Sequence, residues 1–193
     1  MGYVKDRIKE LSKTAGSKKR ARKNAESWFK ESSASRKIVE VKSTRDRFQS
    51  GKIYVFDYSP TTKDLPWYDK NPVVLALEGV NDNDLGVNLN LLPISVKEQL
   101  LDDLYTRMGG SIKSAYNKSY DAERQRALRI TYDGMKSYLE SNGCVFAIRR
   151  YNPSRKKRQS VVSYLRWPDI ALCDFISLNG TTITQIRQMF SKQ

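Results

Sequence analysis

Residues 51–93 read GKIYVFDYSPTTKDLPWYDKNPVVLALEGVNDNDLGVNLNLLP, and within them the apolar residues take the spacing of β-strands. Residues 52–58 are rich in β-branched and aromatic side chains, which suit a pleated, half-buried surface. Residues 73–77 form an apolar run with the length of a buried strand, and residues 85–91 alternate between apolar and polar. Residues 81–84 have the composition of a tight turn, because Asn and Asp tolerate positive φ. We therefore predict three antiparallel strands that form a small β-meander or SH3-like barrel.

A loop with two prolines separates the first two predicted strands. Pro66 and Pro72 restrict the backbone and enclose two adjacent aromatic residues and a carboxylate, Trp67, Tyr68 and Asp69. Large aromatic side chains in such a loop can cover one end of a barrel. Ordered loops also carry many binding sites. The sequence leaves both interpretations open, and Trp67, Tyr68 and Asp69 are the candidate partner-binding residues.

Two helices are expected after the meander. The first spans residues 94–108, where Ser95 and Glu98 have the spacing of a capping box. Its buried stripe is expected to consist of Leu100, Leu101, Leu104 and Met108. The second runs from a cap at Asp121 to about Leu139 and ends at Asn142 and Gly143; its inward-facing residues are expected to be Ala127, Leu128, Tyr132, Met135 and Leu139.

The last third of the chain mixes both kinds of element. Residues 145–148 and 161–165 are strand candidates, and a helix is expected to begin at Trp167. The whole pattern predicts an α+β fold with helices flanking the meander. We divide the chain into a basic, partly flexible N-terminal arm (residues 1–50), an α+β core domain (51–176) and a C-terminal tail with a short helix (177–193).

The predicted arm differs from the rest in charge. Residues 1–50 hold 15 Lys and Arg against 6 Asp and Glu, which places +9 of the net charge of +14 in about a quarter of the chain. Few apolar residues accompany them, so the arm is expected to bury little and to be partly disordered when free. It is either a solvated tail, a contact for a polyanion, or a segment ordered by assembly partners.

The net charge of +14 and the pI near 9.8 indicate a polyanionic partner. Nucleic acid is the first expectation, a membrane surface the second and an acidic protein the third. No stretch approaches the ~20 apolar residues of a membrane span, and the N-terminus lacks the apolar core of a signal peptide. The two cysteines, Cys144 and Cys173, give no reason to expect a disulfide.

The sequence offers little catalytic chemistry. It contains no histidine, no phosphate-cradling glycine loop and no pair of cysteine motifs that would hold zinc. A magnesium-dependent nuclease stays open as an alternative because of five aspartates: Asp57, Asp64, Asp69, Asp102 and Asp103. We predict a protein that is not an enzyme and has no metal and no cofactor.

Three motifs resemble the DNA end protector family of tailed bacteriophages. They are Leu65-Pro66-Trp67-Tyr68-Asp69 with Pro72, then Gly86, Asn88, Leu89, Leu92 and Pro93, and then Leu100-Leu101-Asp102. The similarity resumes at residues 148–151 and 164–169 and covers roughly residues 51–175, whereas Asn71 and Asn90-Leu91 depart from it. The resemblance implies a virion protein that shields packaged double-stranded DNA or its ends, found in the virion and in the host cytoplasm during assembly. The alternative is a purely structural neck, tail or baseplate component whose basic arm threads between neighbouring subunits.

The basic runs are the candidate DNA contacts, and a solvated surface is the alternative. Contacts to phosphate alone would be independent of base sequence. Multiple copies in a particle and other virion proteins as partners are expected, and no membrane. The candidate residues are Lys18, Lys19, Arg20, Arg22, Lys23, Arg149, Arg150, Arg155, Lys156, Lys157, Arg158 and Arg166.

Overall fold

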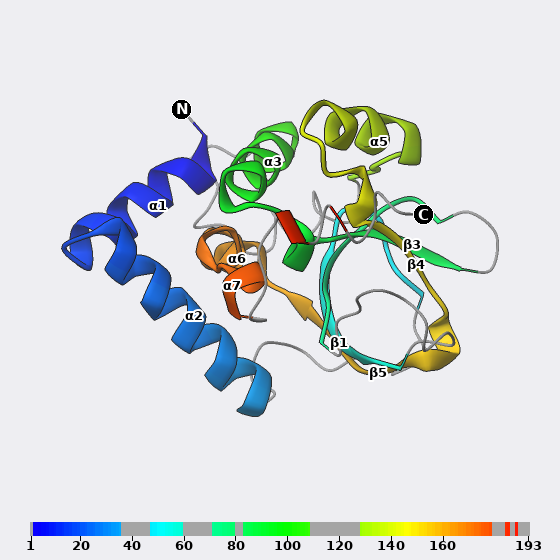
Figure 1. Ribbon diagram of the computed structural model, residues 1–193, viewed down its shortest axis with the longest axis horizontal. Helices are drawn as coiled ribbons and strands as arrows, with labels where there is room; N and C mark the ends of the chain where they lie inside the picture. The colour runs from blue at the N-terminus through cyan, green and yellow to red at the C-terminus, as the bar shows by residue number, and fades with distance from the viewer. Residues whose placement is uncertain are drawn as a thin grey trace. The chain divides into compact units, whose positions relative to one another are not determined.

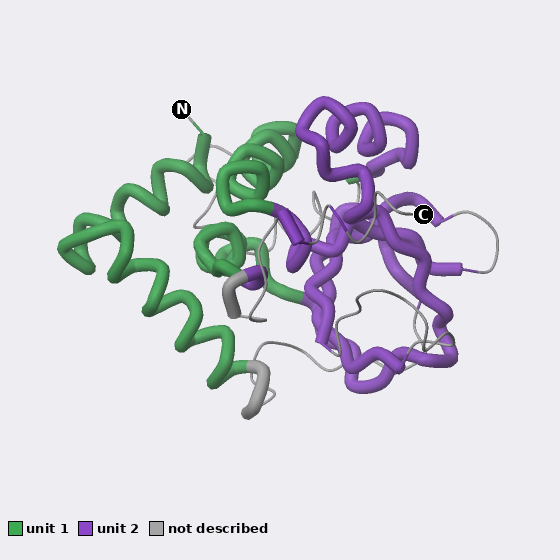
Figure 2. Tube along the Cα trace, viewed as in Figure 1, with its two compact units in different colours: residues 1–39, 93–128, 162–174 green, residues 40–92, 129–161, 175–193 purple. Residues whose placement is uncertain are grey.

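The computed structural model describes residues 2–35, 47–59, 71–79, 83–108 and 128–178, together with residues 184, 185 and 188. Helices and a five-stranded antiparallel sheet make up an α+β fold (Figure 1), which confirms the predicted fold class. The chain divides into two compact units, and each is built from segments that are far apart in the sequence (Figure 2). Unit 1 contains residues 1–39, 93–128 and 162–174, and unit 2 contains the remaining residues, 40–92, 129–161 and 175–193.

Unit 2 contains the sheet. Its strands are β1 (Ile53–Tyr58), β2 (Val73–Ala76), β3 (Asp84–Asn88), β4 (Ile148–Tyr151) and β5 (Lys156–Val162), and they lie in the order β4-β3-β2-β1-β5. The predicted meander forms the centre of this order, with Val74 opposite both Tyr54 and Asn88. The 3-10 turn η4 (Pro153–Arg155) connects the two edge strands. This order, with the last strand beside the first, is that of an SH3-like barrel, and the sheet curls accordingly in Figure 1.

The sheet packs closely at Gly86 on β3, which lies opposite Ala76 of β2. A Cβ added at Gly86 would lie 2.3 Å from Cγ1 of Val74 and 2.8 Å from the backbone oxygen of Leu75, so only glycine fits there. Aromatic residues fill one side of the sheet, and Phe48 stacks on Tyr54 with ring centroids 4.7 Å apart.

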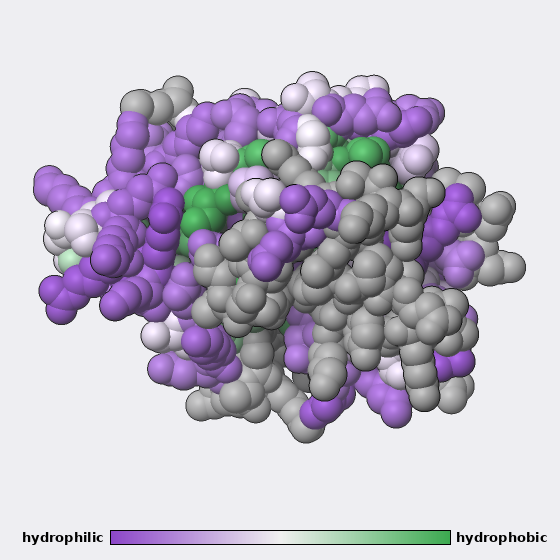
Figure 3. All heavy atoms as spheres, in the orientation of Figure 1, coloured by the Kyte–Doolittle hydropathy of each residue, from purple (hydrophilic) through white to green (hydrophobic). Residues whose placement is uncertain are grey.

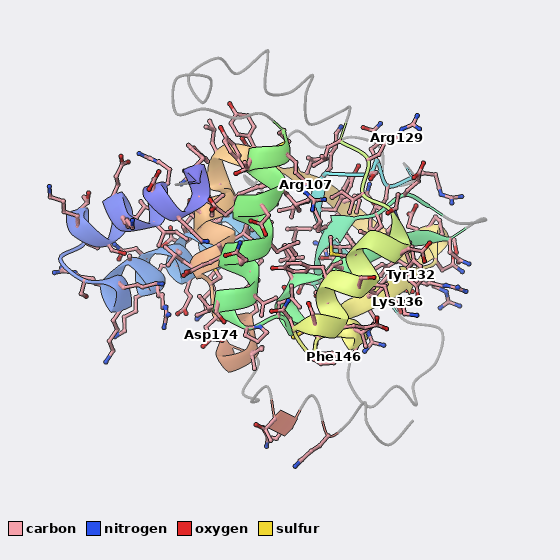
Figure 4. The ribbon with its side chains drawn as sticks, turned by 90° about the horizontal axis from the view of Figure 1, so that it is seen from above. Arg107, Arg129, Tyr132, Lys136, Phe146 and Asp174 are labelled. Atoms are coloured by element: carbon pink, nitrogen blue, oxygen red, sulfur yellow. The ribbon has the colours of Figure 1, made fainter. Side chains whose placement is uncertain are left out.

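Helix α5 (Tyr132–Ser141) is the second predicted helix, but it begins later than expected. Its cap is Thr131, whose Oγ1 accepts a hydrogen bond from the backbone N–H of Gly134 at 3.3 Å. The cap expected at Asp121 lies outside the described residues. Tyr132 is exposed on α5, with Lys136 one turn further along (Figure 4), so the expectation that it faces inward is wrong. Met135 and Leu139 are buried as predicted, and the helix ends at Asn142 and Gly143.

Two predicted strand segments are instead 3-10 turns. The third strand ends at Asn88, and η1 (Leu89–Leu91) follows because the side chain of Asn88 accepts a hydrogen bond from the backbone N–H of Asn90 at 3.1 Å. Likewise η3 (Val145–Ala147) precedes β4 where a strand was expected from residue 145. The 3-10 turn η5 (Tyr164–Arg166) follows β5.

Unit 1 is helical. It contains α1 (Tyr3–Thr14), α2 (Lys18–Ser35), α3 (Ile94–Arg107) and α6 (Trp167–Leu172), and α1 and α2 pack against α6 while α1 also packs against α3. The two N-terminal helices bury Val4, Ile8 and Phe29. The structure therefore differs from the expectation of an arm that buries little: each helix has one narrow apolar stripe, and the partners of that stripe lie late in the chain. The short helix α7 (Phe175–Leu178) belongs to unit 2.

The start of α3 corrects the predicted capping box. The cap residue is Pro93, without a side-chain hydrogen bond, and Ser95 lies within the first turn. Glu98 instead pairs with Lys18, at 2.8 Å between Nζ and Oε1. The predicted stripe of Leu100, Leu101, Leu104 and Met108 is buried, as expected. None of the helices within the described ranges is long and apolar enough to cross a membrane.

Candidate nucleic-acid interface

Helix α2 carries the first group of candidate cations. Lys19, Arg20 and Lys23 are exposed, whereas Ala21 and Ala25 on the opposite side of the helix are buried. The helical period of 3.6 residues produces this separation, because positions 19 and 23 share one face and positions 21 and 25 share the other. None of the three cations pairs with a carboxylate in the described part of the chain. We call Lys19, Arg20 and Lys23 the α2 set. Most of the surface of α1 and α2 that is visible in Figure 3 is hydrophilic.

One cation of this face was not among the candidates. Lys30 is exposed and lies seven residues after Lys23, which is two helical turns along the same face. The spacing could have identified it, but the candidates were chosen by their density along the sequence. Two others are less accessible than expected: Lys18 pairs with Glu98, and Arg22 is half-buried.

The second group of candidates lies on β4, on β5 and in the turn η4 between them. Arg150, Arg155 and Lys157 are exposed, and within the described residues none of them pairs with a carboxylate. We call these three residues the β4–β5 set. Arg149, the neighbour of Arg150 in β4, is only half-exposed because successive side chains of a strand point to opposite faces.

Lys156 is not a surface cation. Its side chain is buried, and its ammonium pairs with the buried carboxylate of Asp84. The same carboxylate accepts hydrogen bonds from Nε of Arg47 at 3.1 Å and from the backbone N–H of Phe48 at 2.9 Å. The ammonium also lies 4.1 Å from the centroid of the Phe48 ring. Lys156 therefore stabilises the end of the barrel, and it cannot reach a phosphate while this cluster is intact.

Arg158 and Arg166 are exposed but already have partners. The guanidinium of Arg158 pairs with Asp57 on β1. That of Arg166 lies 4.9 Å from the ring centroid of Trp28 and 3.3 Å from the carboxylate of Asp169. Burial raises the pKa of Asp169 above its ordinary value, and Arg166 opposes that shift.

The aspartates that suggested a nuclease have structural partners where the structure describes them. Asp57 accepts a hydrogen bond from Nδ2 of Asn71 at 2.8 Å, besides its pairing with Arg158. Asp102 accepts from the backbone N–H of Lys5, and Asp103 from Nε2 of Gln99 at 2.7 Å. The described residues contain no group of three or more acidic, cysteine or histidine side chains that could hold a metal ion. Asp64 and the candidate partner-binding residues Trp67, Tyr68 and Asp69 lie outside the described residues.

Sequence reasoning missed a buried lysine in unit 1. Lys97 is fully buried on α3, and its ammonium donates to the backbone carbonyl of Cys173 at the end of α6. Burial lowers the pKa of Lys97 to about 8 and raises that of the Cys173 thiol to about 12. Both Cys144 and Cys173 are buried free thiols. No pattern marks Lys97, because its partner is a backbone group 76 residues later.

Comparison with protein families decides the relationship of the chain. The model of the family described as phage T4 terminal DNA protecting protein matches residues 2–170. The chain belongs to this family. The family's name indicates protection of phage DNA ends, in agreement with the resemblance seen in the motifs. The match begins at residue 2, so it includes the residues of the two N-terminal helices, which the motif comparison left out. No curated protein and no solved structure matches the chain.

Proposed function

We propose that the protein binds the ends of packaged double-stranded phage DNA through sequence-independent charge contacts and shields them within the virion. The family relationship supports the target, since the family is named for protecting phage DNA ends. The observation that supports binding through charge is the exposure of the α2 set and the β4–β5 set. Neither set has a carboxylate partner among the described residues. Cations held by an internal carboxylate are partly neutralised, whereas these six are exposed and have no such partner in the described ranges, which supports their contact with phosphate.

Apart from Arg155, which lies in the turn η4, the cations of both sets lie on a helix or a strand, which suits contacts to a phosphate backbone. Lys19 and Lys23 follow one helical face, and Arg155 and Lys157 flank the start of a strand. A lysine binds phosphate as a point charge without reading a base, and an arginine can form two parallel hydrogen bonds with phosphate oxygens. We found no motif that presents a recognition helix to a groove, so we expect affinity to depend on salt and hardly on sequence.

The test is a salt titration of duplex DNA binding by fluorescence anisotropy. One variant carries Lys19→Gln, Arg20→Gln and Lys23→Gln, and a second carries Arg150→Gln, Arg155→Gln and Lys157→Gln. A set that contacts three phosphates should flatten the dependence of log K on log salt by about three units when it is removed. The control removes the same charge from exposed cations outside both sets, Lys13, Arg107 and Arg129; Figure 4 labels the last two. If the control protein binds DNA as weakly as both variants do, net charge alone determines binding.

Binding to ends is tested separately by nuclease protection. Wild-type protein should slow exonuclease digestion of a linear duplex, and a duplex closed by hairpins at both ends should compete less well than an open one. Equal competition would show binding along the duplex without preference for ends.

The same titration addresses the structural alternative, a neck, tail or baseplate component. In that case the exposed cations meet acidic surfaces of neighbouring virion proteins. DNA affinity would then be almost the same in wild type and in both variants, while the variants would enter particles poorly. Location in the virion, with a stage in the host cytoplasm during assembly, is part of this proposal and is checked by detecting the chain in purified particles.

A further inference from the structure

The exposure pattern of β5 departs from that of a regular strand. Its first four residues, from Lys156 to Gln159, are buried, exposed, exposed and buried in turn. A regular strand alternates between its two faces, so two consecutive exposed residues indicate an inserted residue, as in a β-bulge. Arg158 has a φ of 53°, and it is the one non-glycine residue with positive φ in the described part of the chain. The strained backbone at Arg158 therefore exposes its side chain directly beside that of Lys157.

Asp57, on the neighbouring strand β1, receives the side chain of Arg158. One carboxylate oxygen of Asp57 pairs with the guanidinium, and the other accepts the hydrogen bond from Nδ2 of Asn71. Asn71 is itself held, because its backbone oxygen accepts a hydrogen bond from Nδ2 of Asn90 at 3.3 Å. Asp57 is thus fixed between two donors and occupies the position from which an anion would contact Arg158.

We infer that Asp57 competes with DNA phosphate for Arg158. The surface formed by Arg158 and the β4–β5 set therefore binds a polyanion less tightly than it would without the carboxylate of Asp57. This inference rests on the proposed function. A phosphate that approaches Arg158 must either displace the carboxylate or lie beside a like charge, and both lower the affinity. The exchange is feasible because the pair is partly exposed: the side chain of Arg158 is 55% and that of Asp57 30% accessible. Ion pairs in such positions are weak in water.

The test is a double-mutant cycle on DNA affinity in the full chain. Asp57→Asn removes the charge but keeps an oxygen for the hydrogen bond from Asn71. It should raise affinity for duplex DNA by up to about fivefold, the range that an exposed ion pair allows, and steepen the salt dependence by about one unit. Arg158→Gly removes the guanidinium and fits the positive φ, so it should fold at least as well as Arg158→Ala. In the Asp57→Asn background it should abolish the gain.

Asp133→Asn, at an exposed position of α5, makes the same change in net charge and is the matched control. The proposed competition is contradicted if Asp57→Asn binds duplex DNA no better than wild type or than Asp133→Asn. It is also contradicted if the gain in DNA affinity persists when Arg158→Gly is added. These outcomes leave the proposed function intact, because wild type still binds DNA in them. Failure of wild type and Asp57→Asn alike to bind DNA overturns the proposed function and the competition with it.

Discussion

The carboxylate of Asp102 on α3 accepts a hydrogen bond from the backbone N–H of Lys5 in the first turn of α1, at 3.2 Å. Its Oδ2 also lies 3.8 Å from the ammonium of Lys5. A carboxylate here satisfies an N–H that the helix leaves free and interacts favourably with the helix dipole. A Cβ added at Gly2 would lie 2.1 Å from this carboxylate, so the approach requires glycine. The aspartate of the Leu-Leu-Asp motif therefore holds the start of the N-terminal helix.

The first prediction concerns this contact. Asp102→Ala should lower the free energy of unfolding by about 1–2 kcal/mol, because a buried carboxylate that caps a helix is lost. Asp103→Ala is the matched control, since Asp103 is half-buried and its hydrogen-bond partner among the described residues is Gln99 of its own helix; it should change stability by less than about 0.5 kcal/mol. Urea unfolding measures both. Equal effects would contradict a special role for Asp102.

The second prediction asks whether α2 contributes to the core of unit 1. Phe29 is only 8% exposed, so Phe29→Ala should destabilise the protein by about 3 kcal/mol. Ser27→Ala changes an exposed position of the same helix and should have little effect. A solvated arm would instead tolerate both substitutions, so an unchanged urea midpoint for Phe29→Ala would restore the expectation from sequence.

The third prediction separates Lys156 from the exposed cations beside it. Lys156→Met keeps the shape of the side chain but leaves a buried carboxylate oxygen of Asp84 without its ammonium, which should cost about 3 kcal/mol. Asp84→Asn in the same chain should recover part of this loss, because the uncompensated charge is removed. The salt dependence of DNA binding should be unchanged in folded Lys156→Met, whereas Lys157→Gln should flatten it by about one unit without a comparable loss of stability.

These contrasts show which features can be read from the sequence. Strands β1 and β2 followed from their composition and length, and the stripe of α3 from its period. The strand β3 was predicted too long. It ends at Asn88 because the side chain of Asn88 accepts a hydrogen bond from the backbone N–H of Asn90, and no apolar period reveals such a bond. The cations at 155–158 look alike in sequence, but the strand buries Lys156 against Asp84, which precedes it by 72 residues.

The burial of the N-terminal helices was missed for a related reason. The inner face of α2 includes Ala21 and Ala25, which contribute little apolar area and so resemble a solvated helix. Helix α2 packs against α1 and against α6, an element more than 130 residues later in the chain. Partners this far apart cannot be paired from one sequence.

The last prediction concerns the dependence of stability on pH at Lys97. The pKa of Lys97 is lowered from 10.5 to about 8 by burial, so between these values the unfolded chain holds a proton that the folded chain has released. Stability rises with pH wherever the unfolded state binds more protons than the folded state. The free-energy penalty of burying the Lys97 ammonium is therefore complete below pH 8 and decreases as pH rises from 8 towards 10.5. The nearby acidic groups, Glu26, Glu98 and Asp174, oppose the shift without cancelling it.

Cys173 acts in the opposite direction above its ordinary pKa of 9.0. Its thiol stays protonated in the folded chain to about pH 12, whereas the unfolded thiol ionises near pH 9, so the contribution of Cys173 to stability falls as pH rises. Between pH 8 and 9 the contribution of Lys97 exceeds the opposing one of Cys173, because the unfolded thiol is still mostly protonated over this range. There the stability of wild type relative to Lys97→Met should rise by about 1 kcal/mol per pH unit, measured by urea unfolding of both proteins at matched salt. Subtracting the Lys97→Met curve removes the titration of every other group that the substitution leaves undisturbed. If the two proteins follow parallel curves from pH 7 to 9, Lys97 keeps its proton in the folded chain and the burial penalty proposed for it is absent.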